Sequence, residues 1–241
     1  MQGIILLMVM SIGAAFVQRV SGFGFGIFIM TALPYLMPSY GEATTLSGLL
    51  ASLTSFIIVS RHYRYLHWHK LSVILTTFLI VSFFAIQFVA KAGDGVLKVC
   101  LGIILILASI WFLFLAGKVR LRPTLPAQLG LGGISGVMGG LFGMQGPPAV
   151  LYFVETTTTK EEYLVTTQMY FLVGNMCMTA YRAYYGLLTP TVVHSWLLGI
   201  AGVIIGTYLG AMAFRHLSLP LLRKIIYVYM AISGGICLFS S

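Results

Sequence analysis

Eight long apolar runs make up most of this 241-residue sequence, and they constrain its fold more than any other feature. The runs cover residues 2–37, 43–60, 71–90, 95–117, 126–154, 163–184, 191–213 and 221–239. A helix needs about 20 apolar residues to cross a bilayer, so six of these runs have the length of a single span. Only 8% of the residues are charged, against about 25% in a soluble domain. The sequence therefore predicts an all-α polytopic membrane protein and excludes a soluble enzyme.

The first and fifth runs are too long for one span, and each contains a cluster of helix-breaking residues. These clusters are SGFGFG at 21–26 and GGLFGMQGPP at 139–148. Non-helical backbone at membrane depth is tolerated only where protein buries it or where it lines a water-filled cavity. Close helix packing through small residues is the alternative explanation, but glycines flanked by proline, glutamine and arginine favour a break. Each of the two runs is therefore expected to form a broken helical hairpin.

The two breaks occupy corresponding places in the two halves of the chain. Gly22 and Gly143 lie 121 residues apart, and in each half a broken segment is followed by three uninterrupted spans. We therefore expect two transmembrane repeats, 1–117 and 126–241, joined by a basic linker at 118–125. Interrupted segments in corresponding positions of two halves indicate the binding site of a transporter.

Basic residues decide the relative orientation of the two halves. If each broken segment returns to its starting side, the halves are inverted, and only Lys91 and Lys98 lie outside. Ten basic residues then lie on the cytoplasmic side: Arg61, Arg64, Lys70, Lys118, Arg120, Arg122, Lys160, Arg215, Arg223 and Lys224. A single crossing by each broken segment would instead force Lys160, Arg215, Arg223 and Lys224 outside, and the basic residues of the chain would then stand seven against six. The positive-inside rule favours the first arrangement, so we expect inverted repeats with both termini outside.

Neither an enzyme nor a nucleic-acid-binding protein is indicated. The net charge of +9 is explained by the positive-inside rule, and no basic stripe with interleaved aromatic residues occurs outside the short loop 61–70. The histidines of that loop have no cysteine or acidic residue beside them, and Cys100, Cys177 and Cys237 stand singly in apolar runs. Neither a metal site nor a disulfide is therefore predicted. Catalytic motifs are missing, so we expect no enzyme and no cofactor.

An anion-binding site is expected where the two breaks meet. An intramembrane cation, here Arg19, is a functional-site hypothesis by default; the alternative is an arginine that extends to the interface. Helix N-termini at the breaks would add free N–H groups and partial positive charge, which suit an oxyanion. The candidate substrate-binding residues at the breaks are Arg19, Ser21, Gly22, Gly24, Gly143, Gln145 and Gly146.

Polar residues on the next spans extend this candidate site. Gln168, Asn175 and Arg182 are each seven residues apart, which returns to nearly the same face of a helix. Buried amides need several hydrogen-bond partners, so Gln168 and Asn175 join Thr45 as substrate-binding candidates, although Ser and Thr often only join membrane helices. A structural role at the outer end of its span explains Arg182 equally well.

The two glycine motifs, Pro34 and the layout of eight apolar runs resemble the TauE/SafE sulfite exporter family over nearly the whole chain. The resemblance implies a bacterial plasma-membrane permease for sulfite, organosulfonates or related small organic anions. The sequence departs from the family's usual Gly-Gly-Gly run in its second motif, where Gln145-Gly146-Pro147-Pro148 stands instead. This difference bears on the substrate more than on the fold.

The expected partners are therefore a small anionic substrate and the lipid bilayer, with no nucleic acid. An anion channel and a non-transporting membrane scaffold are the alternative functions. The sequence leaves open the substrate, the direction of transport, the coupling ion and whether the chain forms a homo-oligomer.

Overall fold

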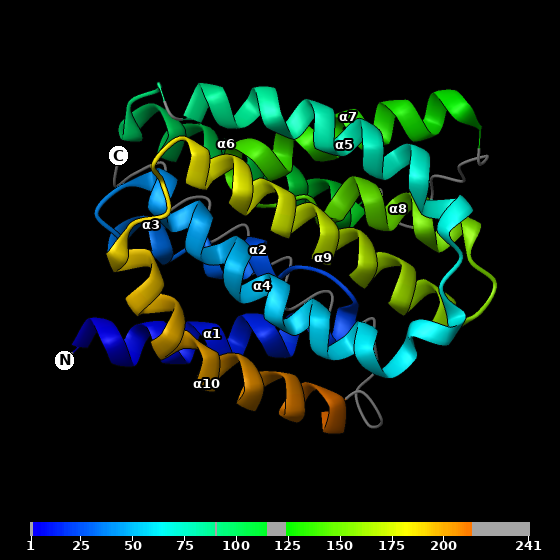
Figure 1. Ribbon diagram of the computed structural model, residues 1–241, viewed down its shortest axis with the longest axis horizontal. Helices are drawn as coiled ribbons and strands as arrows, with labels where there is room; N and C mark the ends of the chain where they lie inside the picture. The colour runs from blue at the N-terminus through cyan, green and yellow to red at the C-terminus, as the bar shows by residue number, and fades with distance from the viewer. Residues whose placement is uncertain (1, 90, 115–123, 214–241) are drawn as a thin grey trace.

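The predicted all-helical architecture is confirmed by a computed structural model that describes residues 2–89, 91–114 and 124–213 (Figure 1). No strand occurs within these ranges. The apolar run 221–239 and most of the predicted linker lie outside them. The first half contains α1 (Gln2–Ser21), α2 (Phe25–Ile29), α3 (Leu33–Leu36), α4 (Tyr40–His62), α5 (Trp68–Val89) and α6 (Asp94–Phe114). The second half contains α7 (Leu125–Phe142), α8 (Gly146–Thr156), α9 (Lys160–Tyr184) and α10 (Pro190–Ala213).

Several of these helices are long and apolar enough to cross a membrane. In the part of the chain that the structure describes, α1, α4, α5, α7 and α10 meet this criterion. Many of their outward side chains are large and apolar, and Phe84 on α5 and Tyr208 on α10 are each more than 60% exposed. A surface of this kind is stable against lipid tails, so the chain is a multi-pass membrane protein.

The helices break at the two glycine clusters. α1 ends at Ser21, and Gly22 and Gly24 then adopt φ values of 82° and 98°, a region that suits glycine because it has no Cβ. α7 ends at Phe142 and is followed by Gly143, whose φ is 67° and whose N–H donates to the carbonyl of Gly139. The bond from the left-handed glycine to the carbonyl four residues before it is the αL type of helix termination, and the next N–H, of Met144, donates to the carbonyl of Met138.

Each break turns the chain back beside the helix that precedes it. In Figure 1, α2 and α3 lead back toward the end of the molecule where α1 begins. In the same way α8 returns toward the end where α7 begins, so the two broken segments form hairpins that enter from opposite ends. The expected broken hairpins are therefore present in the fold.

Helices of one half pack mainly against helices of the other half. The most extensive pairings join α1 to α10, α5 to α7 and α4 to α9, and α4 and α9 run antiparallel through the centre (Figure 1). Glycines permit the close approach of two of these pairs. Gly136 and Gly140 on α7 lie against α5, and Gly202 and Gly206 on α10 lie against the backbone of α1. Small residues at fixed spacing are the usual means of close helix packing in membranes.

The two central helices start in the same way. Ser39 caps α4 by accepting a hydrogen bond from the N–H of Glu42 at 3.2 Å. Thr159 caps α9 by accepting a hydrogen bond from the N–H of Glu162 at 3.1 Å. Both sequences have Ser or Thr followed three residues later by Glu, which is typical of a helix N-terminus. The two caps stand 120 residues apart, close to the spacing of the two breaks.

Candidate functional site

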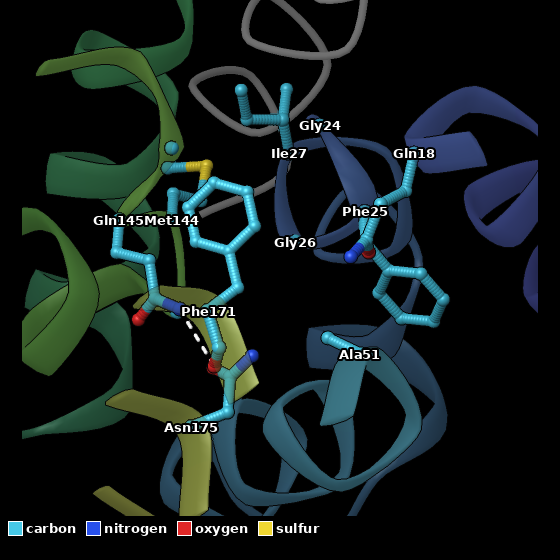
Figure 2. Close-up of a pocket in the computed structure, with 12 residues that line it drawn as sticks. Gln18, Gly24, Phe25, Gly26, Ile27, Ala51, Met144, Gln145, Phe171 and Asn175 are labelled. Carbon is cyan, nitrogen blue, oxygen red and sulfur yellow. Dashed lines mark hydrogen bonds between the residues drawn. The ribbon is translucent and has the colours of Figure 1, made fainter. Parts of the chain in front are cut away.

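The two breaks face each other across one small pocket in the centre of the molecule (Figure 2). Its volume is about 30 Å³, enough for about two water molecules. The lining residues come from both breaks and from the flanking helices α1, α4 and α9: Gln18, Gly24, Phe25, Gly26, Ile27, Ala51, Gly143, Met144, Gln145, Gly146, Phe171 and Asn175. Five of the residues predicted from the sequence thus lie together, namely Gly24, Gly143, Gln145, Gly146 and Asn175.

The backbones of the two breaks are in direct contact. A Cβ placed on Gly26 would overlap the carbonyl oxygen of Gly143, so a side chain at this position would force the breaks apart. Gly26 belongs to the SGFGFG motif but was not among the predicted site residues. Its role depends on the approach of a segment more than 110 residues away in the sequence, which no local pattern reports.

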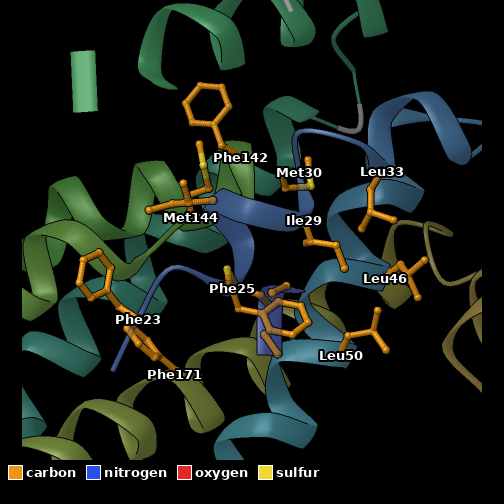
Figure 3. Close-up of a cluster of buried hydrophobic side chains, with 14 of the residues drawn as sticks. Phe23, Phe25, Ile29, Met30, Leu33, Leu46, Leu50, Phe142, Met144 and Phe171 are labelled. Atoms are coloured by element: carbon orange, nitrogen blue, oxygen red, sulfur yellow. The ribbon is translucent and has the colours of Figure 1, made fainter. Parts of the chain in front are cut away.

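The glycines of the first motif allow close backbone contact, whereas its phenylalanines are large and pack the break into the apolar core. Phe23 and Phe25 are 3% and 2% exposed. They belong to a cluster of apolar side chains around both breaks (Figure 3) that also contains Met30, Met144 and Phe171. In the motif, glycines therefore allow the turn and the contact between breaks, while the alternate phenylalanines fix it against α4, α8 and α9.

A buried amide network supports the first break. The side-chain nitrogen Nε2 of Gln168 donates to the carbonyl of Gly22 at 2.7 Å. Its oxygen Oε1 accepts from Nε2 of Gln18 at 2.7 Å and from Oγ of Ser55 at 3.0 Å. All three side chains are at most 1% exposed. Gln168 on α9 thus binds the backbone of the first break but does not line the pocket. Gln18 belongs both to this network and to the pocket lining.

A second network supports the other break. Ser135 on α7 donates from Oγ to the carbonyl of Gln145 at 2.5 Å, and Ser135 in turn accepts from the hydroxyl of Tyr170 at 2.8 Å. The side chain of Gln145 donates from Nε2 to the carbonyl of Phe171 at 3.5 Å (Figure 2). Sequence patterns did not indicate Gln18 or Ser135, because their partners lie on other helices.

The pocket offers neutral hydrogen-bond donors. Asn175 is 4% exposed and lines the pocket. α8 begins at Gly146 and continues with Pro147 and Pro148, which have no N–H. Of the orphan N–H groups at an ordinary helix N-terminus, only those of Gln145 and Gly146 therefore remain. The neutral donors at the pocket are therefore these two backbone groups of the second break and the side-chain amides of Gln145 and Asn175.

Arg182 is completely buried on α9 and binds backbone carbonyls instead of a carboxylate. Its guanidinium donates from Nη2 to Gly139 and Gly140 at 3.0 and 3.2 Å, and from Nη1 to Thr44 at 3.2 Å. The first two carbonyls belong to the last turn of α7, where a helix carries partial negative charge. Arg182 therefore stabilises the end of α7 directly before the second break.

Other predicted residues lie outside the pocket. Ser21 donates from its hydroxyl to the carbonyls of Val17 and Phe23 at 2.8 and 2.6 Å, and so stabilises the first break from within. Thr45 donates to the carbonyl of Gly41 inside α4 at 2.7 Å. Arg19 lines a separate cavity between α1, α4 and α10. Gly22 and Gln168 belong to the amide network behind the pocket.

Comparison with known proteins decides the class of this chain. The family model described as "Sulfite exporter TauE/SafE" matches residues 7–236, which include both breaks. The chain belongs to the TauE/SafE sulfite exporter family. Its members are transporters, so the prediction of a membrane transporter and not an enzyme is confirmed. The resemblance read from the glycine motifs is confirmed with it.

A curated relative supports the same class. The chain is 24% identical over 204 residues to the "Probable sulfite/organosulfonate exporter TauE" of Cupriavidus necator. The alignment covers 80% of this chain and 77% of that relative. No solved structure gives a significant match.

Proposed function

We propose that this chain is a permease that moves a small sulfur-containing oxyanion, such as sulfite or an organosulfonate, across the plasma membrane. The observation that carries the proposal is the convergence of both breaks on one pocket. The name of the Cupriavidus relative supports this class of substrate. The binding residues are the lining groups with donors, Asn175, Gln145 and Gly146, together with the glycines Gly24 and Gly143 that let the backbone approach the ligand.

The chemistry of the pocket suits a weakly held oxyanion. Amide and backbone N–H groups match the acceptor oxygens of sulfite or a sulfonate group, and they bring no fixed counter-ion. A transport site must bind well enough to load and weakly enough to release. Because the pocket has room for only about two water molecules, loading requires the two hairpins to separate, in the manner of repeats that rock against each other.

Inverted repeats over 1–117 and 126–241 are part of the proposal. If the two repeats are matched element by element, α1 corresponds to α7, α4 to α9 and α5 to α10. The packing of α1 against α10 then corresponds to the packing of α7 against α5, and the pair α4–α9 corresponds to itself. The matching caps of α4 and α9 support the same relation. The antiparallel course of α4 and α9, and the entry of the hairpins from opposite ends (Figure 1), favour inversion over a parallel repeat.

The proposed orientation has both termini outside. Arg61, Arg64 and Lys70 gather at the end of the molecule where α4 meets α5, whereas Lys91 lies at the opposite end. The positive-inside rule assigns the first end to the cytoplasm. In this orientation an exported anion gains about 2.3 kcal/mol per charge for each 100 mV of a negative-inside potential, so export needs no buried carboxylate for a coupling cation.

Flux of radiolabelled sulfite and sulfoacetate from proteoliposomes tests the proposal. We expect saturable flux in the unmodified chain and loss of most of it in Asn175→Ala and Gln145→Ala. Gln87→Ala is the matched control, because Gln87 lies on α5 and does not line the pocket. Flux that does not saturate with anion concentration would indicate an anion channel instead of a permease. Unchanged flux in both pocket variants would place the binding site elsewhere, and no flux of any sulfur oxyanion would remove the proposed substrate class.

A further inference from the structure

A second cavity lies between α1, α4 and α10, away from the pocket between the breaks. Its volume is about 270 Å³, far larger than that of the central pocket. The cationic side chains that line it are Arg19 from α1 and Arg61 from α4, and His62 follows Arg61 directly. The described lining residues include no carboxylate. Two guanidinium groups that share one cavity repel each other, so the site favours an anion.

A buried hydroxyl adds an independent sign of a ligand. Thr207 on α10 lines the cavity and is 5% exposed. Its oxygen Oγ1 is fully buried and has no hydrogen-bond partner among the described residues. Buried hydroxyls in proteins are normally paired. A ligand with acceptor oxygens would satisfy Thr207 and lie beside the guanidinium groups of Arg19 and Arg61.

The other described residues that line the cavity, apart from His62, are mostly apolar, and the cavity reaches the lipid-facing surface of α10. Ile57 and Ile58 from α4 and Ile204 from α10 supply most of this lining. Ile204 and Tyr208 also line the cavity and are 52% and 66% exposed on α10, a helix long and apolar enough to span the membrane. The cavity is therefore accessible from the bilayer. An apolar wall with a basic end suits a molecule with an oxyanion head and a hydrocarbon tail.

We propose that this cavity binds an anionic phospholipid, with the phosphate between Arg19 and Arg61 and an acyl chain along Ile57 and Ile204. Basic pockets between membrane helices bind anionic lipid head groups in this way. A small hydrophilic anion such as sulfite would leave the isoleucine walls without a partner. In this site Arg19 binds lipid and is not a ligand of the transported anion.

Lipid-dependent thermal stability tests the proposal without any measurement of transport. The full chain is purified in detergent, and its Tm is measured with added phosphatidylglycerol or phosphatidylcholine, since a ligand that binds only the folded state raises Tm. We expect phosphatidylglycerol to raise Tm more than phosphatidylcholine. Arg61→Gln and Arg19→Gln should lose most of this difference. Arg64→Gln is the matched control, because Arg64 lies at the same end of the molecule but does not line the cavity.

Three results would overturn the lipid site. Equal stabilisation by the two lipids would show that the head-group charge is not recognised. An equal loss in Arg64→Gln and Arg61→Gln would show that only surface charge attracts the lipid. Inorganic phosphate or sulfite that stabilises the chain as much as phosphatidylglycerol would assign the cavity to a free oxyanion. If Arg19→Gln does not fold, Arg61→Gln still decides, because Arg61 is exposed, and native mass spectrometry of retained lipid gives a second readout.

Discussion

The carbonyl oxygen of Gly143 occupies the place where a Cβ on Gly26 would lie. The two residues belong to different halves of the chain, and their contact brings the two broken hairpins together at the central pocket. The transport site proposed above thus depends on a backbone-to-backbone contact that only glycine at position 26 permits.

Gly26→Ala is expected to remove most transport. The added methyl group must push the breaks apart, and overpacking of this kind costs about 1–3 kcal/mol. Anion flux in proteoliposomes and Tm are the measurements. Gly133→Ala is the matched control, because nothing lies within 4 Å of a Cβ at that position on α7. Wild-type flux in Gly26→Ala would show that contact between the breaks is not needed for transport.

Gly143→Ala tests backbone conformation separately from steric contact. A Cβ at this position would lie 3.7 Å from Oγ of Ser47, an ordinary contact, but the φ of 67° is unfavourable for alanine. The expected loss of unfolding free energy is about 1–2 kcal/mol, measured by thermal or denaturant unfolding. Gly130→Ala, with open space around its Cβ, should lose none. A Gly143→Ala variant as stable as Gly130→Ala would contradict a left-handed residue at the end of α7.

Gln168→Ala is expected to destabilise the first break. The change leaves the carbonyl of Gly22 without its side-chain donor and removes one of the two acceptors of the Gln18 amide, the other being Oγ of Ser55, and a buried unsatisfied group costs about 1–3 kcal/mol. In a double-mutant cycle with Gln18→Ala, the double variant should lose less unfolding free energy than the sum of the two single losses, because both changes remove the same hydrogen bond. Additive losses would show that the two amides do not form one network.

Arg182→Met is expected to lower stability by about 1–3 kcal/mol, because three carbonyls lose their donor. Arg182→Lys should lie between this variant and the unmodified chain, since an ammonium group keeps the charge but not the planar fork. Tm of the purified variants is the measurement, with the exposed Arg64→Met as control. A neutral effect of Arg182→Met would show that the end of α7 does not depend on this cation.

The sequence alone determined the class of the protein and the positions of its breaks. Hydropathy over about 20 residues reports whether a helix is stable in lipid, so the runs that form most of α4, α5 and α10 were found without any tertiary information. Glycine and proline act on the backbone within one or two residues. The ends of α1 and α7 could therefore be read from Gly22 and Gly143.

Tertiary structure decided which of these residues meet. Gln18 and Arg19 are neighbours on α1, but successive residues of a helix point about 100° apart. Gln18 consequently reaches Gln168 and the central pocket, while Arg19 lies against Gly210 of α10 and lines the other cavity. The sequence identified Arg19 as unusual because an intramembrane cation stands out by its chemistry. Its surroundings, like the contact of Gly26 with Gly143, depend on the packing of distant helices, which the local pattern of residues does not contain.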